Sequence, residues 1–205
     1  INHAVLSYIE PYASSTCEMV AEILQYIGDN VKLKSDEANA IYAGIIVDTN
    51  NFTNKAGVRT FEAAAFIRRS GADIIKVRKL LRDDMNEYKA RAEAVRHAEV
   101  YRDSFALAVC PSANLESPTI VGAQAANELL NINGVKASIV FTYFNNEVYL
   151  SARSIDEVNV QLIMEKLGGG GHMTIAGAQL KDVTVDEAIE LVKKTLDGMI
   201  EEGEI

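Results

Sequence analysis

The sequence predicts an α/β protein with a mostly helical first part, a long connector helix, and a second part built on a mixed sheet. Three patterns support this prediction. Apolar residues recur at helical spacing in the first 82 residues, an amphipathic stretch without Gly or Pro follows, and β-branched and aromatic runs then alternate with helical patterns. We therefore expect three regions, 1–82, 83–103 and 104–205, with helices packed on the sheet of the last region.

The first region is expected to hold four helices. The capping-box pattern Ser15-Thr16-Cys17-Glu18 opens the first helix, and Gly28 ends it. Ser35, followed by two acidic residues at the positive end of a helix, opens a second helix that runs to Asp48. After a polar, asparagine-rich loop, two further helices are predicted over 59–70 and 73–81.

The amphipathic stretch from Asp83 to Arg102 is predicted to be one connector helix, and the last region to have the order β-α-β-β-α-β-α. Asn145-Asn146 fits a two-residue hairpin turn, and Gly168 to Gly171 is expected to be a loop between a helix and a strand. The predicted strands are 105–110, 138–144, 147–152 and 174–180, and the predicted helices are 120–130, 158–167 and 185–200.

Composition excludes several classes of protein. The 205 residues are 48% apolar and 24% charged, which supplies enough apolar material for a core and argues against a disordered chain. The longest apolar stretches fall far short of the roughly 20 residues that cross a bilayer, so no membrane contact by this chain is expected. Two cysteines far apart in sequence fit neither a disulfide scaffold nor a zinc motif, and they indicate a reducing, cytoplasmic setting.

Charge is distributed unevenly along the chain. The net charge of −9 argues against binding to extended nucleic acid. Between Lys55 and Arg82, however, eight basic and two acidic residues give a local charge of +6. Most of these side chains are interpreted as a solvated helix face. The alternative is that a few of them, Arg59 above all, attract an anionic substrate.

Two candidate sites place charged groups at the ends of predicted elements. Asp48 opens the asparagine-rich loop, where a carboxylate either binds a divalent cation or caps the next turn. Arg153-Ser154 follows a predicted strand, where the guanidinium can make paired hydrogen bonds to a phosphate and the serine can add a hydroxyl. The alternative is that Arg153 pairs with Asp156 or Glu157 and that Ser154 caps the next helix.

A third candidate is the glycine run Gly168-Gly169-Gly170-Gly171, which precedes His172. Consecutive glycine N–H groups can form an anion-binding nest, and the backbone can approach a ligand closely. The imidazole can then donate to a phosphate oxygen or transfer a proton near neutral pH. The alternative is a flexible loop with a solvent-facing histidine.

Four segments occur together in this order: Glu10-Pro11-Tyr12-Ala13-Ser14-Ser15-Thr16, Asp48-Thr49-Asn50-Asn51-Phe52 with Gly57-Val58-Arg59-Thr60-Phe61, Arg153-Ser154, and Gly168 to His172. The first resembles the segment that follows the Asp-His-His triplet of the DHH phosphoesterase superfamily, and the second resembles the superfamily's fourth motif. The last two resemble the signatures of the DHH-associated domain. Within the superfamily, the sequence is most similar to the C-terminal region of the cyclic di-AMP phosphodiesterases of the GdpP type.

This resemblance implies the C-terminal part of a DHH domain over 1–82 and a DHH-associated substrate-binding domain over 104–205. It implies a hydrolase in which two Mn²⁺ ions activate water for attack on a phosphodiester. Asp48 matches a metal ligand of the fourth motif. The substrate-binding patch of the family is matched by Arg153, Ser154, Gly168, Gly169, Gly170, Gly171 and His172, and His172 is also the candidate catalytic residue.

The Asp-His-His triplet itself does not occur in this sequence. Because one carboxylate cannot hold two metal ions, we expect the chain to be a fragment of a larger enzyme, inactive or nearly inactive alone. We also expect its helical region to expose apolar surface and to associate with a second copy as a homodimer.

The function expected from the resemblance is hydrolysis of cyclic di-AMP to pApA by the parent protein, with this chain supplying one metal ligand and the nucleotide-binding domain. Two alternatives stay open. One is a nanoRNase-like or pApA-phosphatase-like enzyme acting on short oligonucleotides, and the other is a nucleotide-binding module without catalysis. The resemblance also implies a cytoplasmic region of a membrane-anchored parent.

Overall fold

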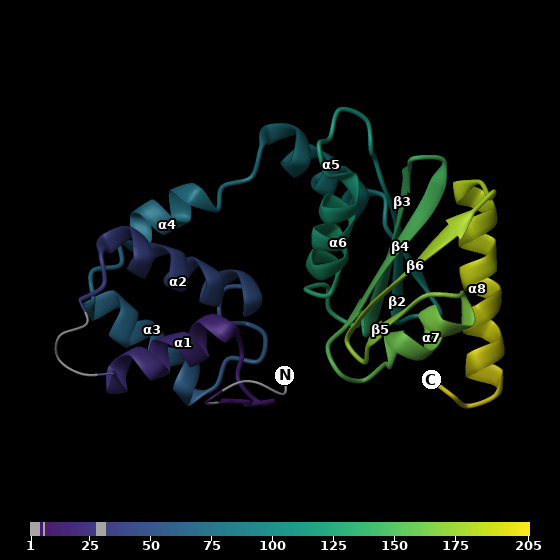
Figure 1. Ribbon diagram of the computed structural model, residues 1–205. Helices are drawn as coiled ribbons and strands as arrows, with labels where there is room; N and C mark the ends of the chain where they lie inside the picture. The colour runs from purple at the N-terminus through teal and green to yellow at the C-terminus, as the bar shows by residue number, and fades with distance from the viewer. Residues whose placement is uncertain (1–4, 6, 28–31) are drawn as a thin grey trace. The chain divides into compact units, whose positions relative to one another are not determined.

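The computed structural model describes residues 5, 7–27 and 32–205, which divide into two units at Arg82 and Asp83 (Figure 1). Over these residues the predicted α/β class is confirmed, with eight helices and a six-stranded mixed sheet. The predicted end of the first helix at Gly28 lies outside the described residues. Within the described part of the chain, no helix combines the length and the apolar character needed to cross a bilayer.

The N-terminal unit is helical. Its elements are α1 (Thr16–Tyr26), α2 (Ser35–Asp48), α3 (Val58–Arg69) and α4 (Ile74–Leu80). The first three pack against one another, and α4 packs against α2. The predicted cap of α1 is present, because Ser15 Oγ accepts a hydrogen bond of 3.0 Å from Glu18 N. A Cβ on Gly44 would meet Cys17 Sγ, so α1 and α2 approach closely here and a larger residue would require the Cys17 side chain to move.

The C-terminal unit is built on one sheet in the order β1-β2-β3-β4-β6-β5. The strands are β1 (Glu99–Tyr101), β2 (Phe105–Cys110), β3 (Ala137–Phe144), β4 (Glu147–Ser154), β5 (Gly170–His172) and β6 (Ile175–Lys181). Strands β2 and β3 are parallel and are joined by α6 (Pro118–Leu129), whereas all other neighbours are antiparallel.

Helices cover both faces of this sheet (Figure 1). On one side lie α5 (Met85–Arg96) and α6, and on the other lie α7 (Val160–Lys166) and α8 (Val185–Glu201). The larger core, which contains the fully buried Phe141, lies between the sheet and the α7–α8 side. Helix α6 packs closely on β3, since a Cβ on Gly122 would lie 2.3 Å from Thr142 Oγ1.

The predicted connector helix over 83–102 is wrong at its C-terminal end. Helix α5 stops at Arg96, and the next residues form β1, which pairs antiparallel with β2 through Val100 and Ala106. Arg102 and Asp103 have positive φ angles of 49° and 61°, and they make the tight turn between these two strands. Hairpin pairing with β2 therefore overrides the helical pattern, and α5 belongs to the C-terminal unit.

Candidate functional site

Arg153 and His172 lie in one row across three neighbouring strands. In the register of the sheet, Arg153 of β4 is opposite Ile175 of β6, and Ile175 is opposite His172 of β5. Directly opposite residues project from the same face of a sheet. The guanidinium and the imidazole therefore share one face, with backbones two strand spacings, about 10 Å, apart.

Arg153 is a largely buried cation without a carboxylate partner in the described part of the chain. Its Nη1 donates to the carbonyl oxygen of Ala152 at 2.8 Å, and its buried Nε has no hydrogen-bond partner. Burial lowers the pKa of the guanidinium, which nevertheless remains charged near neutral pH. The alternative partner Glu157 pairs instead with Lys136 at 2.9 Å. The arrangement leaves donors and positive charge available for an anion.

Ser154 projects from the opposite face of β4. It is buried, its N donates to Thr174 O at 3.0 Å, and its Oγ donates to Met173 O at 3.4 Å. The alternative that Ser154 caps the next helix is wrong, because Asn159 caps α7. These contacts of Ser154 hold the turn that follows His172.

The predicted glycine loop is wrong for its second half. Gly170 to His172 form the edge strand β5, paired with β6. Gly168 has a φ of +78° and donates to Glu165 O at 3.0 Å, while Gly169 donates to Met164 O at 2.8 Å. These two bonds form a Schellman motif that ends α7. The N–H groups of Gly168 and Gly169 are therefore engaged within the chain and do not form the predicted nest.

The remaining glycines differ in what surrounds them. A Cβ on Gly169 would lie 2.1 Å from Gly177 O, and one on Gly171 would lie 2.5 Å from Ala176 Cα, so both need glycine to pack on β6. A Cβ on Gly170 would meet nothing within 4 Å. Gly170 is opposite Gly177 in the register and projects from the face that holds Arg153 and His172. This face is therefore open above Gly170, and His172 beside it is exposed.

In the N-terminal unit, Asp48 is the exposed last residue of α2. The turn after it is fixed by buried Thr49, whose Oγ1 donates to Ile45 O at 2.6 Å and accepts from Phe52 N at 3.0 Å. Across 5, 7–27 and 32–205, no three His, Cys, Asp or Glu side chains are grouped so that they could hold a metal ion. The described residues therefore do not form a two-metal centre, and whether Asp48 binds a metal stays a prediction.

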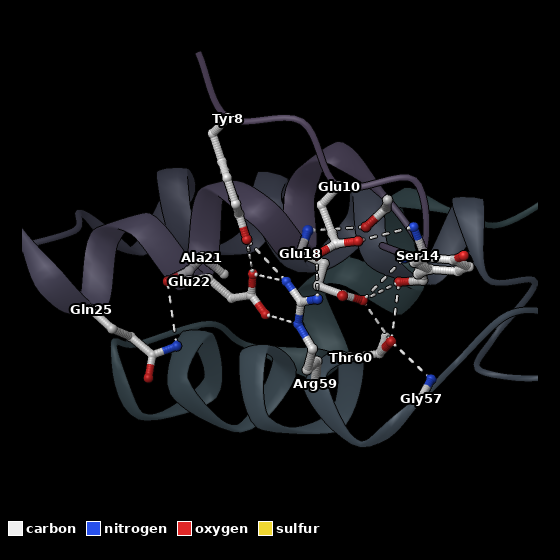
Figure 2. Close-up of polar contacts among 12 residues, drawn as sticks. Tyr8, Glu10, Ser14, Glu18, Ala21, Glu22, Gln25, Gly57, Arg59 and Thr60 are labelled. Atoms are coloured by element: carbon white, nitrogen blue, oxygen red, sulfur yellow. Dashed lines mark hydrogen bonds and ion pairs between the residues drawn. The ribbon is translucent and has the colours of Figure 1, made fainter. Parts of the chain in front are cut away.

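Arg59 is held by two carboxylates and a phenol, as Figure 2 shows. Its Nε and Nη2 donate to the Glu22 carboxylate at 2.7 and 2.8 Å, its Nη1 donates to Glu10 at 3.0 Å, and its Nη2 also donates to Tyr8 OH at 3.0 Å. The hydrogen bonds from Arg59 lower the pKa of Glu22. Arg59 thus connects the segment before α1 to α1 and α3. A cavity of about 860 Å³ borders this cluster on the same unit.

A buried polar network in the N-terminal unit was not predicted. The Glu18 carboxylate is 2% exposed and accepts hydrogen bonds from Ser14 Oγ, from Ser14 N at 3.3 Å, and from Thr60 Oγ1 at 2.6 Å (Figure 2). These bonds join the start of α1 to the first turn of α3. The only sequence signal was the capping-box pattern, in which Glu18 is expected to bind the backbone beside Ser15 rather than Thr60.

The C-terminal unit is similar to a known domain family. Residues 109–202 match the DHHA1 domain family. The chain is 44% identical over 199 residues to the cyclic-di-AMP phosphodiesterase PdeA of Listeria monocytogenes, covering 97% of this chain and 30% of that protein. It is 43% identical over 205 residues to the cyclic-di-AMP phosphodiesterase GdpP of Bacillus subtilis, covering 99% and 31%. The resemblance predicted from the motifs is thereby confirmed, and the chain spans about 30% of the length of these relatives.

A solved structure shows the same fold. The crystal structure of an exopolyphosphatase-related protein from Bacteroides fragilis aligns with a TM-score of 0.82 at 20% identity. The alignment covers 96% of this chain and 60% of that protein.

Proposed function

We propose, from the premise that the C-terminal unit carries a DHHA1 domain, that this unit binds the nucleotide in a phosphodiesterase that hydrolyses cyclic di-AMP to pApA. The similarity to two cyclic-di-AMP phosphodiesterases supports this substrate class. In the proposal Asp48 supplies one metal ligand to the complete enzyme. Dependence on Mn²⁺, a cytoplasmic location and association as a homodimer belong to the same proposal.

One observation carries the proposal: Arg153 is largely buried, lacks a carboxylate among the described residues, and shares a face with His172. A buried cation without a partner is costly, because it has lost water without gaining a counter-charge. A phosphate group supplies both the charge and the acceptors that the guanidinium lacks. His172 donates to a second phosphate oxygen, and the open space above Gly170 admits the nucleotide.

Titration of the 205-residue chain with pApA tests this site, using ¹⁵N NMR to detect weak binding and to locate it. We expect shifts at β5 and β6 in the wild type. Arg153→Ala is expected to weaken binding about tenfold or more, because a charge-assisted hydrogen bond is lost. Arg96→Ala is the matched control, since it removes the same charge from an exposed position on α5. Equal affinity of the two variants would contradict the proposed site.

The catalytic part of the proposal is tested by incubating this chain with Mn²⁺ and cyclic di-AMP and separating the products. We expect no turnover, because the described residues do not group into a metal centre. Formation of pApA in proportion to protein would show that an active centre assembles in this chain. The complete enzyme is expected to cleave cyclic di-AMP in preference to linear pApA. The reverse preference would favour the nanoRNase-like alternative.

A further inference from the structure

Three polar side chains form a second cluster on the face that holds Arg153 and His172. Tyr149 of β4 is opposite Gln179 of β6, and Glu147 lies two residues before Tyr149 on the same face. Gln179 Nε2 donates to Glu147 Oε2 and, at 3.1 Å, to Tyr149 OH. Tyr149 OH in turn donates to Glu147 Oε2 at 3.4 Å. The hydroxyl, amide and carboxylate therefore form one closed set of hydrogen bonds.

This cluster fixes which end of the Gln179 amide is available to a ligand. A carboxylate only accepts hydrogen bonds, so the group of Gln179 that faces Glu147 must be the NH₂. Its two hydrogens are then used by Glu147 and Tyr149. The amide oxygen Oε1 has no hydrogen-bond donor among the described residues, and Gln179 is exposed. The cluster thus presents one oriented acceptor to solvent.

The distance from this acceptor to the phosphate site suits a nucleotide. Tyr149 and Arg153 are four residues apart on β4, which is about 13 Å along a strand. Between their two rows, the same face carries Ser151, Gly177 and Gly170, so two of three positions have no side chain. A nucleoside monophosphate can lie across these small residues with its phosphate at one end and its base at the other.

We infer that Gln179, oriented by Glu147 and Tyr149, recognises the base of the nucleotide and favours adenine. The 6-amino group of adenine donates to Gln179 Oε1, whereas guanine presents an oxygen at the same position, and two acceptors repel each other. Glutamine side chains recognise the same amino group of adenine in DNA. This inference rests on the proposed function, because it places the phosphate at Arg153 and His172.

Titration of the wild-type chain with pApA, pGpG and inorganic pyrophosphate, followed by ¹⁵N NMR, tests this inference. We expect pApA to bind about three- to tenfold more tightly than pGpG, as one hydrogen bond allows. Gln179→Ala is expected to bring the two affinities within twofold without changing the affinity for pyrophosphate. Gln161→Ala is the matched control, because its amide also binds a glutamate, Glu165, but lies on α7 at the other face.

Glu147→Gln provides a second variant that leaves Gln179 in place. With an amide at position 147, Gln179 can rotate by half a turn, so we expect the adenine preference to fall. A purely structural role of the cluster would leave the ratio of the two affinities unchanged. Equal binding of pApA and pGpG by the wild type, or an unchanged ratio of affinities in Gln179→Ala, would overturn the inference. Pyrophosphate binding at Arg153 in the same experiment would still support the proposed function. Absence of any binding would overturn both.

Discussion

Single alanine substitutions at Gly169 and Gly170 test separately whether this segment packs closely on β6 and whether the face above Gly170 must be open for a ligand to bind. In Gly169→Ala, the new Cβ would lie 2.1 Å from Gly177 O and 2.6 Å from Ala178 Cβ. Both atoms belong to β6, and neither can rotate away, so β5 must move. Overpacking of this kind costs about 1–3 kcal/mol. That is a large fraction of the roughly 5–15 kcal/mol that stabilises a typical domain.

Gly170→Ala is the matched control, one residue further along. The new Cβ meets nothing within 4 Å, so no atom has to move. Alanine also restricts the unfolded chain more than glycine does. We therefore expect Gly170→Ala to leave the free energy of unfolding unchanged or to raise it by about 0.5–1 kcal/mol.

Urea denaturation followed by far-UV circular dichroism measures the difference, and ¹⁵N NMR assigns the transition to the C-terminal unit. Gly169→Ala is expected to lower the urea midpoint at an unchanged slope. Gly170→Ala is expected to keep or slightly raise the midpoint but to weaken pApA binding, because its methyl group occupies the face between Arg153 and Gln179. A Gly169→Ala variant as stable as the wild type would refute the packing of β5 on β6.

Three further predictions concern the N-terminal unit and the cysteines. Thr60→Val is expected to lower the free energy of unfolding by about 1–3 kcal/mol, because it removes a hydrogen-bond donor to the buried Glu18 carboxylate. Thr60→Ser keeps the hydroxyl and should retain this hydrogen bond. Equal urea midpoints for the two variants would contradict the prediction. Arg59 lowers the pKa of Glu22 in the folded chain, so its contribution to stability is present above the ordinary value of 4.5 and is lost as the pH falls through the lowered value. The stability difference between wild type and Glu22→Gln should therefore be largest near pH 7 and vanish in acid, and a difference that grows in acid would oppose it. Burial raises the pKa of Cys110 to about 11. Its thiol should therefore react with Ellman's reagent at pH 8 only after unfolding in urea. Rapid labelling of Cys110 in the folded chain would contradict this prediction.

Most helices and strands were predictable because their signals are local. The cap at Ser15 and the apolar periodicity of α2 depend on residues within one or two turns. Side chains alternate between the two faces along a β-strand. The positions of Arg153 and Ser154 as neighbours in β4 therefore imply that they project from opposite faces. The family motif places the two residues in one patch, and only the strand geometry separates them.

The features that were missed depend on which strands pair and in which register. Strand β1 forms because β2 is available to pair with it, and nothing in Glu99 to Tyr101 excludes a helix locally. The order β4-β6-β5 brings His172 into the row of Arg153, and the same pairing brings Gln179 to Tyr149. A register shift of one residue would move each of these side chains to the other face.

The contrast between Arg59 and Arg153 shows why sequence alone could not rank the two candidate anion sites. The carboxylates that bind Arg59 come from Glu22 and Glu10, which lie 37 and 49 residues away. An anion at Arg59 would have to displace these two groups, which already supply its acceptors and its counter-charge. Arg153 has charge, burial and an unsatisfied Nε, and no carboxylate of the described chain competes for it. These contacts support the proposal that a phosphate binds at the sheet, whereas Arg59 holds the segment before α1 in place.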